Sequence, residues 1–254
     1  VGSGAIGTEL ASFYNSMGTE VTLVEFMPQL VPNEDEEVSK ALGRSLKKAG
    51  IKVMTKSSVE SVDTSGLLCK VSVKTKKGEE IIEAEKVLSA VGITPNTENL
   101  GLEKAGINTE KGYILVDEFY QTNIPGIYAI GDVIPGIALA HVASAEGIIC
   151  VEKLAGHNPV PLDYNNIPGC TYTSPEVASV GYTEKGALEA GFDIKIGKFP
   201  YTASGKASAA GAKEGFIKLI FDTKHGELLG AHMLGANVTE MIAEIVVARK
   251  LEIT

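Results

Sequence analysis

The sequence contains no tryptophan and only three cysteines, and its 23 lysine and arginine residues are outnumbered by 32 aspartate and glutamate residues. The resulting net charge of −9 argues against a nucleic-acid partner, because binding phosphates requires a basic face. No apolar run approaches the ~20 residues of a membrane-spanning helix, which argues against a membrane protein. The whole sequence is 44% apolar and 22% charged, and with its 254 residues it is typical of a globular chain with one large or two ordinary domains.

The cysteines are too far apart to act together. Cys69, Cys150 and Cys170 match neither a metal-ligand spacing nor that of a redox pair. We therefore expect reduced thiols in a reducing compartment, and no metal site.

The first 55 residues have the pattern of the helix and second strand of a βαβ unit, followed by a further helix and a third strand. Residues 5–17 place four apolar side chains on one helical face: Ile6, Leu10, Phe13 and Met17. A β-branched run at 20–26 predicts a strand. A second helix is expected to begin with Asn33 as its cap and to end at Gly50, with acidic residues first and basic residues last, before a strand at 51–55.

The pattern then changes twice. Residues 59–85 alternate and are broken by Gly-containing turns, which predicts a three-stranded antiparallel meander. Buried strands are expected at 86–92 and 126–132, with a loop-rich segment between them and a helix at 140–155. Beyond the Pro-, Gly- and Asn-rich residues 156–169, an α+β unit is expected, with strands at 170–173, 177–183, 193–201, 215–222 and 227–235 and a helix at 238–251.

A G-x-G-x-x-G motif is formed by Gly2, Gly4 and Gly7, followed by a helix, a strand and Glu25. Glycines there permit a tight turn and close approach of a pyrophosphate to the helix N-terminus, and the carboxylate can accept from ribose hydroxyls. Since Glu25 repels a 2′-phosphate and no Lys or Arg lies in 26–33, NAD is favoured over NADP. The alternatives are a structural glycine turn and a solvated strand end.

A second candidate site is the Gly-Asp turn at Asp132, which precedes the helix at 140–155. A carboxylate there can bind a polyol, and amides at the helix start can meet an anionic ring edge. A simple helix cap is the alternative for the aspartate, and a packed histidine is the alternative for His141.

Six segments in order resemble the flavin disulfide oxidoreductases, and most of all those that reoxidise protein-bound dihydrolipoamide: VGSGAIGTELA, TLVEFMPQLVP, VLSAVGITPNT, TNIPGIYAIGDV, LAHVASAEG and YTSPEVASVGYTE. The resemblance covers the whole chain and implies an α/β fold. It predicts an incomplete Rossmann-type NAD-binding domain with its meander (1–93), a segment that completes the FAD domain (94–160) and an α+β interface domain (161–254).

The resemblance also implies the binding residues for two cofactors. Those for NAD are Gly2, Gly4, Ile6, Gly7, Glu9, Glu25, Val59 and Gly92. Those for FAD are Asp132, Ala138, Leu139, Ala140 and His141. Where the family often has Gly-Arg, this chain has Gly92 and Ile93, which removes one charge contact.

The family's redox disulfide and its His-Glu pair find no counterpart in this sequence, so we expect a fragment without catalytic residues. The expected partners are a second copy, bound through 161–254, and the lipoyl domains of 2-oxo acid dehydrogenase or glycine cleavage complexes. A bacterial cytoplasm is the expected location, with the mitochondrial matrix as the alternative. A glutathione or mercuric reductase and a non-catalytic nucleotide-binding module are the alternative functions.

Overall fold

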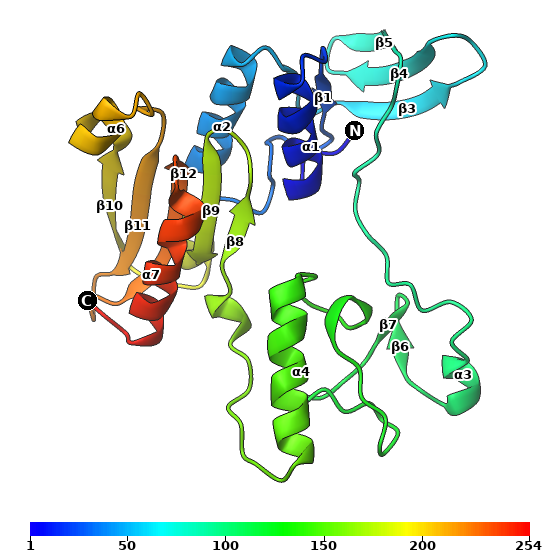
Figure 1. The fold of residues 1–254 in the computed structure, drawn as a ribbon, viewed down its shortest axis with the longest axis vertical. Helices are drawn as coiled ribbons and strands as arrows, with labels where there is room; N and C mark the ends of the chain where they lie inside the picture. The colour runs from blue at the N-terminus through cyan, green and yellow to red at the C-terminus, as the bar shows by residue number, and fades with distance from the viewer. The chain divides into compact units, whose positions relative to one another are not determined.

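The structure is a computed structural model that describes residues 1–254 as two compact units (Figure 1). One unit combines Val1–Gly92 with Pro168–Thr254, and the other is Ile93–Ile167. Mixed helices, parallel strands and antiparallel sheets confirm the predicted α/β class. The predicted domain boundaries at 93 and 160 stay predictions.

The first unit begins with the predicted βαβ arrangement. Its elements are α1 (Ala5–Ser16), β1 (Thr22–Val24), α2 (Glu36–Lys48) and β2 (Lys52–Met54). β1 and β2 pair in parallel, with Leu23 opposite Val53. The dipole of α2 is matched by acidic side chains in its first turn and basic ones in its last.

The antiparallel meander is confirmed as β3 (Ser58–Asp63), β4 (Cys69–Thr75) and β5 (Gly78–Ala84). Val71 and Val73 of the central strand are buried and pack with Val24 of β1. This apolar contact attaches the meander to the βαβ unit.

Residues 168–254 form a five-stranded antiparallel sheet of order β10-β11-β12-β9-β8. Its strands are β8 (Gly169–Thr171), β9 (Glu176–Gly181), β10 (Ile194–Pro200), β11 (Phe216–Asp222) and β12 (Leu228–Gly235). The helices of this part are α5 (Glu184–Glu189), α6 (Gly205–Ala209) and α7 (Val238–Lys250). All five strands and the last helix agree with the sequence pattern within a few residues.

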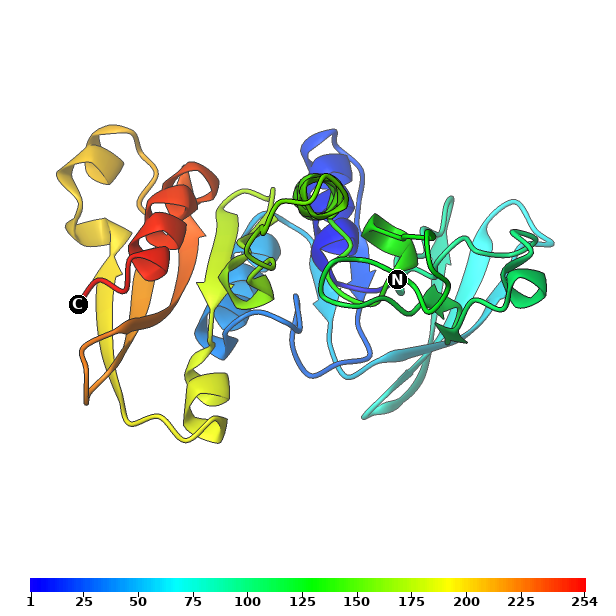
Figure 2. The same ribbon diagram turned by 90° about the horizontal axis from the view of Figure 1, so that it is seen from below.

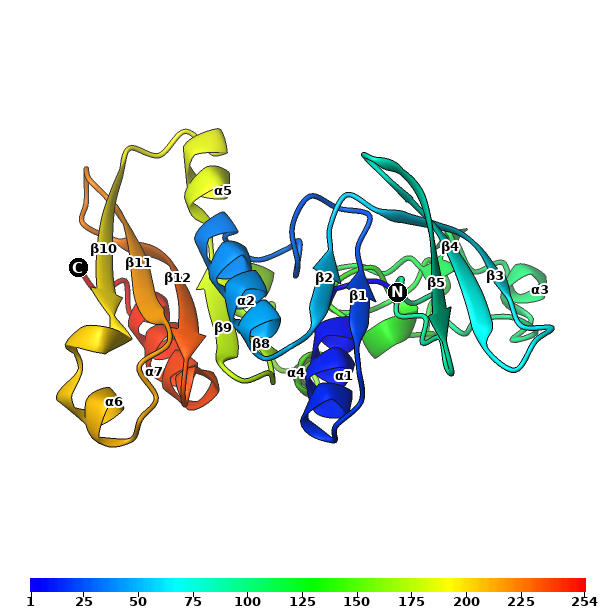
Figure 3. The same ribbon diagram turned by 90° about the horizontal axis from the view of Figure 1, so that it is seen from above.

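Helices cover both faces of this sheet. Figure 2 shows α7 along one face, where Ala178 and Met233 pack with the helix residue Ile242. Figure 3 shows α2 against the other face, where Val177 and Leu234 share one apolar cluster with the helix residues Val38 and Leu42. The βαβ unit and the sheet of residues 168–254 therefore have a common hydrophobic core.

The second unit has little regular structure apart from one long helix. It contains α3 (Leu102–Ala105), β6 (Thr109–Glu110), β7 (Tyr113–Ile114), the 3₁₀ turns η1 (Gly131–Val133) and η2 (Tyr164–Asn166), and α4 (Ala140–Leu154). Its core includes Ile114, Tyr120, Ile134 and Cys150. The predicted helix at 140–155 is confirmed.

Two predicted strands are wrong. Residues 86–92 are irregular, and Ala90 N donates only to Val1 O at 2.8 Å, so no ladder forms. Residues 126–132 make one isolated bridge, between Gln121 and Tyr128, before η1 begins. Apolar runs predict burial, but a strand also needs a neighbouring backbone with which to pair.

Two helix details also differ from what the sequence predicts. The N-cap of α2 is Asp35, whose carboxylate accepts from Glu37 N at 3.0 Å, and not Asn33. On α1, Ile6, Phe13 and Met17 are more than half exposed, and the helix packs through smaller residues such as Ala11. None of the helices is both long and apolar enough to cross a membrane.

Candidate nucleotide-binding site

The predicted glycine turn is a tight loop between the chain's first residue and α1. Gly2 has a φ of +88°, and a Cβ there would lie 2.3 Å from Ala90 O. A Cβ on Gly7 would lie 2.1 Å from Gly2 O. Neither position has room for a side chain, so both glycines are needed for the turn itself.

Gly4 has a different environment. It is the N-cap of α1, no side chain caps the helix start, and a Cβ on Gly4 would meet no atom within 4 Å. The helix therefore presents amide donors and the positive end of its dipole to open space. An anionic group of a dinucleotide fits this arrangement, because it can approach the backbone where a side chain would block it.

Glu25 lies directly after β1 and faces this turn. Its side chain is 6% exposed, and its Oε2 accepts from both Ser3 N and Ser3 Oγ at 2.7 Å. Oε1 accepts from Met27 N at 2.6 Å. The carboxylate is thus fixed beside the glycine turn, with lone pairs left for hydroxyl donors such as those of a ribose.

Ser3 was not among the sequence candidates, because the motif leaves its position unspecified. It is fully buried, and its carbonyl accepts from Thr8 Oγ1 at 3.0 Å and from Val31 N at 2.8 Å. Ser3 therefore joins the turn to α1, to Glu25 and to the loop that follows Glu25. In the sequence, Ser3 is marked only by its place as a small polar residue between Gly2 and Gly4.

The remaining NAD candidates surround this turn less closely. Ile6 is exposed on the first turn of α1, and Glu9 Oε1 accepts from Tyr172 N at 2.8 Å. Val59 packs against the Val24 cluster, and Gly92 has a φ of +131°, where an added Cβ would meet no atom within 4 Å. Their contact with a nucleotide stays a prediction.

The FAD candidates lie in the second unit. Asp132 is exposed in η1, and Ala138 and Leu139 lead into α4, where Ala140 and His141 form the first turn. No side chain caps the start of α4. An exposed carboxylate and a helix start without a side-chain cap are compatible with a polyol and an anionic ring edge, and the binding of a flavin by these residues stays a prediction.

Glu146 is a residue of this unit that sequence reasoning missed. It is 2% exposed, its Oε2 accepts from Gly131 N at 2.6 Å, and its Oε1 accepts from Tyr164 Oη at 2.6 Å. Burial, together with the hydrogen bond to Glu146, raises the pKa of the Tyr164 hydroxyl, which therefore stays a donor. Glu146 thus fixes the turn that carries Asp132.

Other kinds of site are not supported. The three cysteines are free, and no group of three or more His, Cys, Asp or Glu side chains could hold a metal ion. A hollow of about 410 Å³ over β10 and β11 is lined by residues such as Lys195, Phe221 and Thr223, and it contains none of the predicted site residues.

Comparisons with known proteins agree with this geometry. Residues 1–147 match the family model described as pyridine nucleotide-disulphide oxidoreductase, and residues 167–254 match the dimerisation domain of that family. Dihydrolipoyl dehydrogenases from Rhizobium etli and Zymomonas mobilis are 50% and 48% identical over the whole chain. The chain spans about half the length of these relatives, 53% and 55%.

Solved structures give the same result. LpdA from Mycobacterium tuberculosis superposes with a TM-score of 0.90 at 28% identity, covering 100% of this chain and 55% of that one. The HOCl-induced flavoprotein disulfide reductase RclA from Escherichia coli superposes with a TM-score of 0.91 at 28% identity, covering 100% of this chain and 58% of that one. The predicted cofactor pair, FAD and NAD, is confirmed as that of the matched family and its dihydrolipoyl dehydrogenases.

Proposed function

The chain belongs to the pyridine nucleotide-disulphide oxidoreductase family, and from this premise we propose that it carries the NAD site, part of the FAD site and the dimer interface of a dihydrolipoamide dehydrogenase. Such an enzyme oxidises protein-bound dihydrolipoamide and passes the electrons to NAD⁺. The observation that carries the proposal is the buried Glu25 carboxylate, which is bonded to Ser3 in a glycine turn that is open to an approaching group at Gly4.

NAD rather than NADP is the proposed nucleotide. The Glu25 carboxylate would bind the hydroxyls of the adenosine ribose and would repel a 2′-phosphate. The residues that follow, FMPQLVPN at 26–33, include no lysine or arginine that could bind such a phosphate. The 50% identity to a dihydrolipoyl dehydrogenase supports the same assignment.

The geometry of the glycine turn and of Asp132 supports the following proposed roles. Backbone amides at the start of α1 would bind the pyrophosphate, with Gly4 leaving room for it, and Glu25 would orient the adenosine end. Asp132 would bind the flavin's polyol chain. When bound, FAD supplies the redox chemistry that links a dithiol to a nicotinamide.

We assign no catalytic residue to this chain. Its cysteines stand singly and are not spaced as a redox pair, so the disulfide and the His-Glu pair of the mechanism would lie in other parts of the polypeptide. The 254 residues alone are therefore expected not to turn over lipoamide.

The proposed partners are a second copy of the chain and lipoyl domains. The match of residues 167–254 to a dimerisation domain supports a homodimer formed through 161–254. Lipoyl domains of 2-oxo acid dehydrogenase or glycine cleavage complexes would supply the substrate. The cytoplasm of a bacterium is the proposed location, since the relatives compared are bacterial, with the mitochondrial matrix as the alternative.

A second candidate function is that of another disulfide reductase. The structural similarity to RclA favours it, at a TM-score of 0.91. The identity to RclA is 28%, against 50% to a dihydrolipoyl dehydrogenase, so lipoamide is the preferred substrate.

The test uses the full-length holoenzyme that contains this chain. We expect dihydrolipoamide to reduce NAD⁺ at a rate well above that for NADP⁺. Glu25→Gln should raise KM for NAD⁺ and narrow this preference, because a neutral side chain no longer repels a 2′-phosphate. Turnover of glutathione disulfide or mercuric ion in place of lipoamide would refute the assignment.

A further inference from the structure

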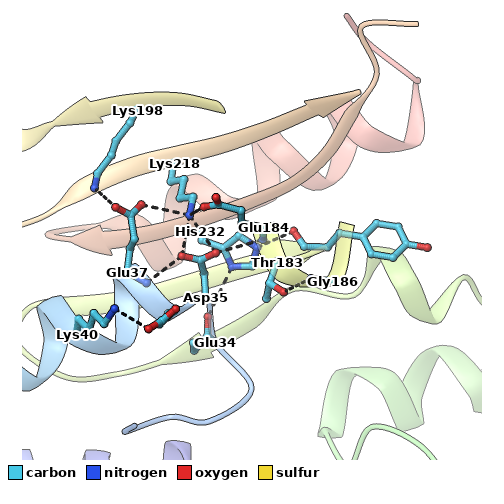
Figure 4. Close-up of polar contacts among 12 residues, drawn as sticks. Glu34, Asp35, Glu37, Lys40, Thr183, Glu184, Gly186, Lys198, Lys218 and His232 are labelled. Atoms are coloured by element: carbon cyan, nitrogen blue, oxygen red, sulfur yellow. Dashed lines mark hydrogen bonds and ion pairs between the residues drawn. The ribbon is translucent and has the colours of Figure 1, made fainter. Parts of the chain in front are cut away.

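A buried lysine joins the sheet of residues 168–254 to the N-terminus of α2 (Figure 4). Lys218 is in β11, the second strand of the sheet, and is fully buried. Its Nζ lies 3.0 Å from Asp35 Oδ1 and 3.1 Å from Asp35 Oδ2. The proposed function gives this contact no role.

The ammonium group has further carboxylate partners. Lys218 Nζ lies 2.5 Å from Glu184 Oε2 and 3.2 Å from Glu37 Oε2. Its three donors thus meet three carboxylates, which come from the α2 N-terminus and from α5. Burial alone would lower the pKa of Lys218, but the hydrogen bonds to Glu184 and Asp35 outweigh it and raise this pKa.

Asp35 is held from both sides. Besides Lys218, its carboxylate accepts from Glu37 N at 3.0 Å and from Glu184 N at 3.2 Å. Burial would raise its pKa, but the hydrogen bond from Lys218 and the two from backbone amides outweigh it and hold the pKa below its ordinary value. The neighbouring Glu34 also reaches the sheet, where its Oε1 accepts from Ser179 Oγ at 3.0 Å.

The loop 25–35 connects this cluster to the nucleotide site. It begins at Glu25 and ends at Asp35. In its middle, Val31 N donates to Ser3 O at 2.8 Å, and Ser3 in turn donates to Glu25 Oε2. Leu30 and Val31 are 2% and 3% exposed, packed in the apolar core.

The loop has internal hydrogen bonds as well. Gln29 Nε2 donates to the carbonyls of Pro32 and Glu34, both at 3.3 Å, and Ser39 Oγ donates to Leu30 O at 2.6 Å. The loop is therefore bonded along its length and fixed at both ends, which makes it a contiguous network between the charged cluster and the nucleotide site.

We propose that Lys218 is a positioning residue for the nucleotide site: by holding Asp35 from the sheet, it fixes the loop 25–35 and, through that loop, Glu25 and Ser3. The inference rests on the proposed NAD site. It gives the sheet of residues 168–254 a part in nucleotide affinity, because the sheet supplies the buried cation that holds the loop.

The experiment measures NAD⁺ binding to the full-length holoenzyme by calorimetry, with the thermal midpoint measured alongside. Lys218→Met removes the charge at similar volume, and Asp35→Asn keeps a good helix cap while removing the carboxylate. We expect each variant to raise Kd and KM for NAD⁺ about 5- to 150-fold, the range of ordinary coupling between sites, with kcat at saturating NAD⁺ and the flavin spectrum unchanged.

The matched control is Ile220→Ala, two residues along the same strand. Ile220 is fully buried in an apolar cluster with Ala187 and Leu229, and its side chain takes no part in the hydrogen bonds and ion pairs of the charged cluster. A cavity there should lower the thermal midpoint while leaving NAD⁺ affinity unchanged. A purely structural Lys218 would behave in the same way as Ile220.

Unchanged NAD⁺ affinity in folded Lys218→Met and Asp35→Asn, despite a lower thermal midpoint, overturns the inference. If Lys218→Met does not fold, unchanged affinity of Asp35→Asn alone overturns it. Absence of NAD⁺ binding by the unsubstituted protein would refute the proposed function, whereas binding equal in protein and variants refutes only the role of Lys218.

Discussion

Alanine at Gly4 and at Gly7 separates the nucleotide-binding role of the glycine turn from its structural role. A Cβ on Gly4 would meet no atom within 4 Å, and Gly4 has a φ of −61°, which alanine adopts freely. A Cβ on Gly7 would lie 2.1 Å from Gly2 O. The same chemical change is thus harmless to the fold at one position and disruptive at the other.

The stability effects can be worked from these environments. At Gly4, the gain of about 0.4–1 kcal/mol from a less flexible unfolded chain nearly cancels the cost of about 1 kcal/mol for alanine as an N-cap. At Gly7, overpacking against backbone costs about 1–3 kcal/mol or more. Each kcal/mol shifts the thermal midpoint by about 2–4 °C at this chain length, so Gly7→Ala should lower it by about 2–12 °C.

Both Gly4→Ala and Gly7→Ala should weaken NAD⁺ binding strongly. Gly4→Ala places a methyl group where the pyrophosphate would approach the α1 amides. Loss of one hydrogen bond to a charged group costs about 1.5–3 kcal/mol, which corresponds to an increase in Kd of about 10- to 100-fold. The assay is calorimetric titration with NAD⁺ beside thermal unfolding. NAD⁺ affinity of a stable Gly4→Ala variant equal to that of the unsubstituted protein would refute the site.

Three further outcomes are expected. Because the pKa of Asp35 is depressed in the folded protein, its carboxylate stabilises the fold above the unfolded pKa of about 3.9, and this contribution is lost as the pH falls through the folded pKa. The thermal midpoint of Asp35→Asn should therefore vary less with pH in acid than that of the unsubstituted protein. The pKa of Lys218 is raised, so its contribution to the free energy of unfolding is complete below about pH 10.4 and is lost as the pH rises through the folded pKa. Alkaline denaturation of the unsubstituted protein and of Lys218→Met, measured side by side, checks this loss. Glu146→Ala removes the acceptor of Gly131 N and the shorter hydrogen bond of Tyr164 Oη, which keeps its contact with Tyr120 Oη at 3.4 Å. Since Tyr164 is 36% exposed, the cost in denaturant unfolding should be about 1–3 kcal/mol, and a loss below about 0.5 kcal/mol would contradict the network.

Periodicity and turn chemistry predicted the elements whose partners lie nearby in the sequence. The meander was predictable because Gly78 closes a tight turn between two alternating runs. The helix α2 was predictable from charges that suit its dipole, although Asp35 rather than Asn33 caps it. Asp35 also bonds to Lys218, 183 residues away along the chain, and local sequence does not reveal this contact.

Sequence patterns could not decide the strands that depend on a distant partner. Residues 86–92 are apolar enough for a strand, yet only Ala90 and Leu88 bond to Val1, so the segment stays irregular. Lys218 carries a recognisable signal in the sequence. It interrupts an otherwise apolar run, between Phe216 and Ile220 on the same face of β11, where a lysine needs buried partners.

The buried cluster has a meaning that its net stability does not reveal. The apolar contacts between α2 and the sheet, where Val38 and Leu234 belong to one cluster, are non-directional. An ammonium surrounded by three carboxylates has one favourable geometry. Removing one partner leaves a buried charge without its counter-charge, although replacing the whole cluster by apolar side chains can give equal stability. The apolar core therefore holds α2 on the sheet, whereas the contact of Lys218 with Asp35 fixes the position of the helix N-terminus along the sheet. Since the loop that ends at Asp35 begins at Glu25, that choice also sets the position of the proposed nucleotide carboxylate.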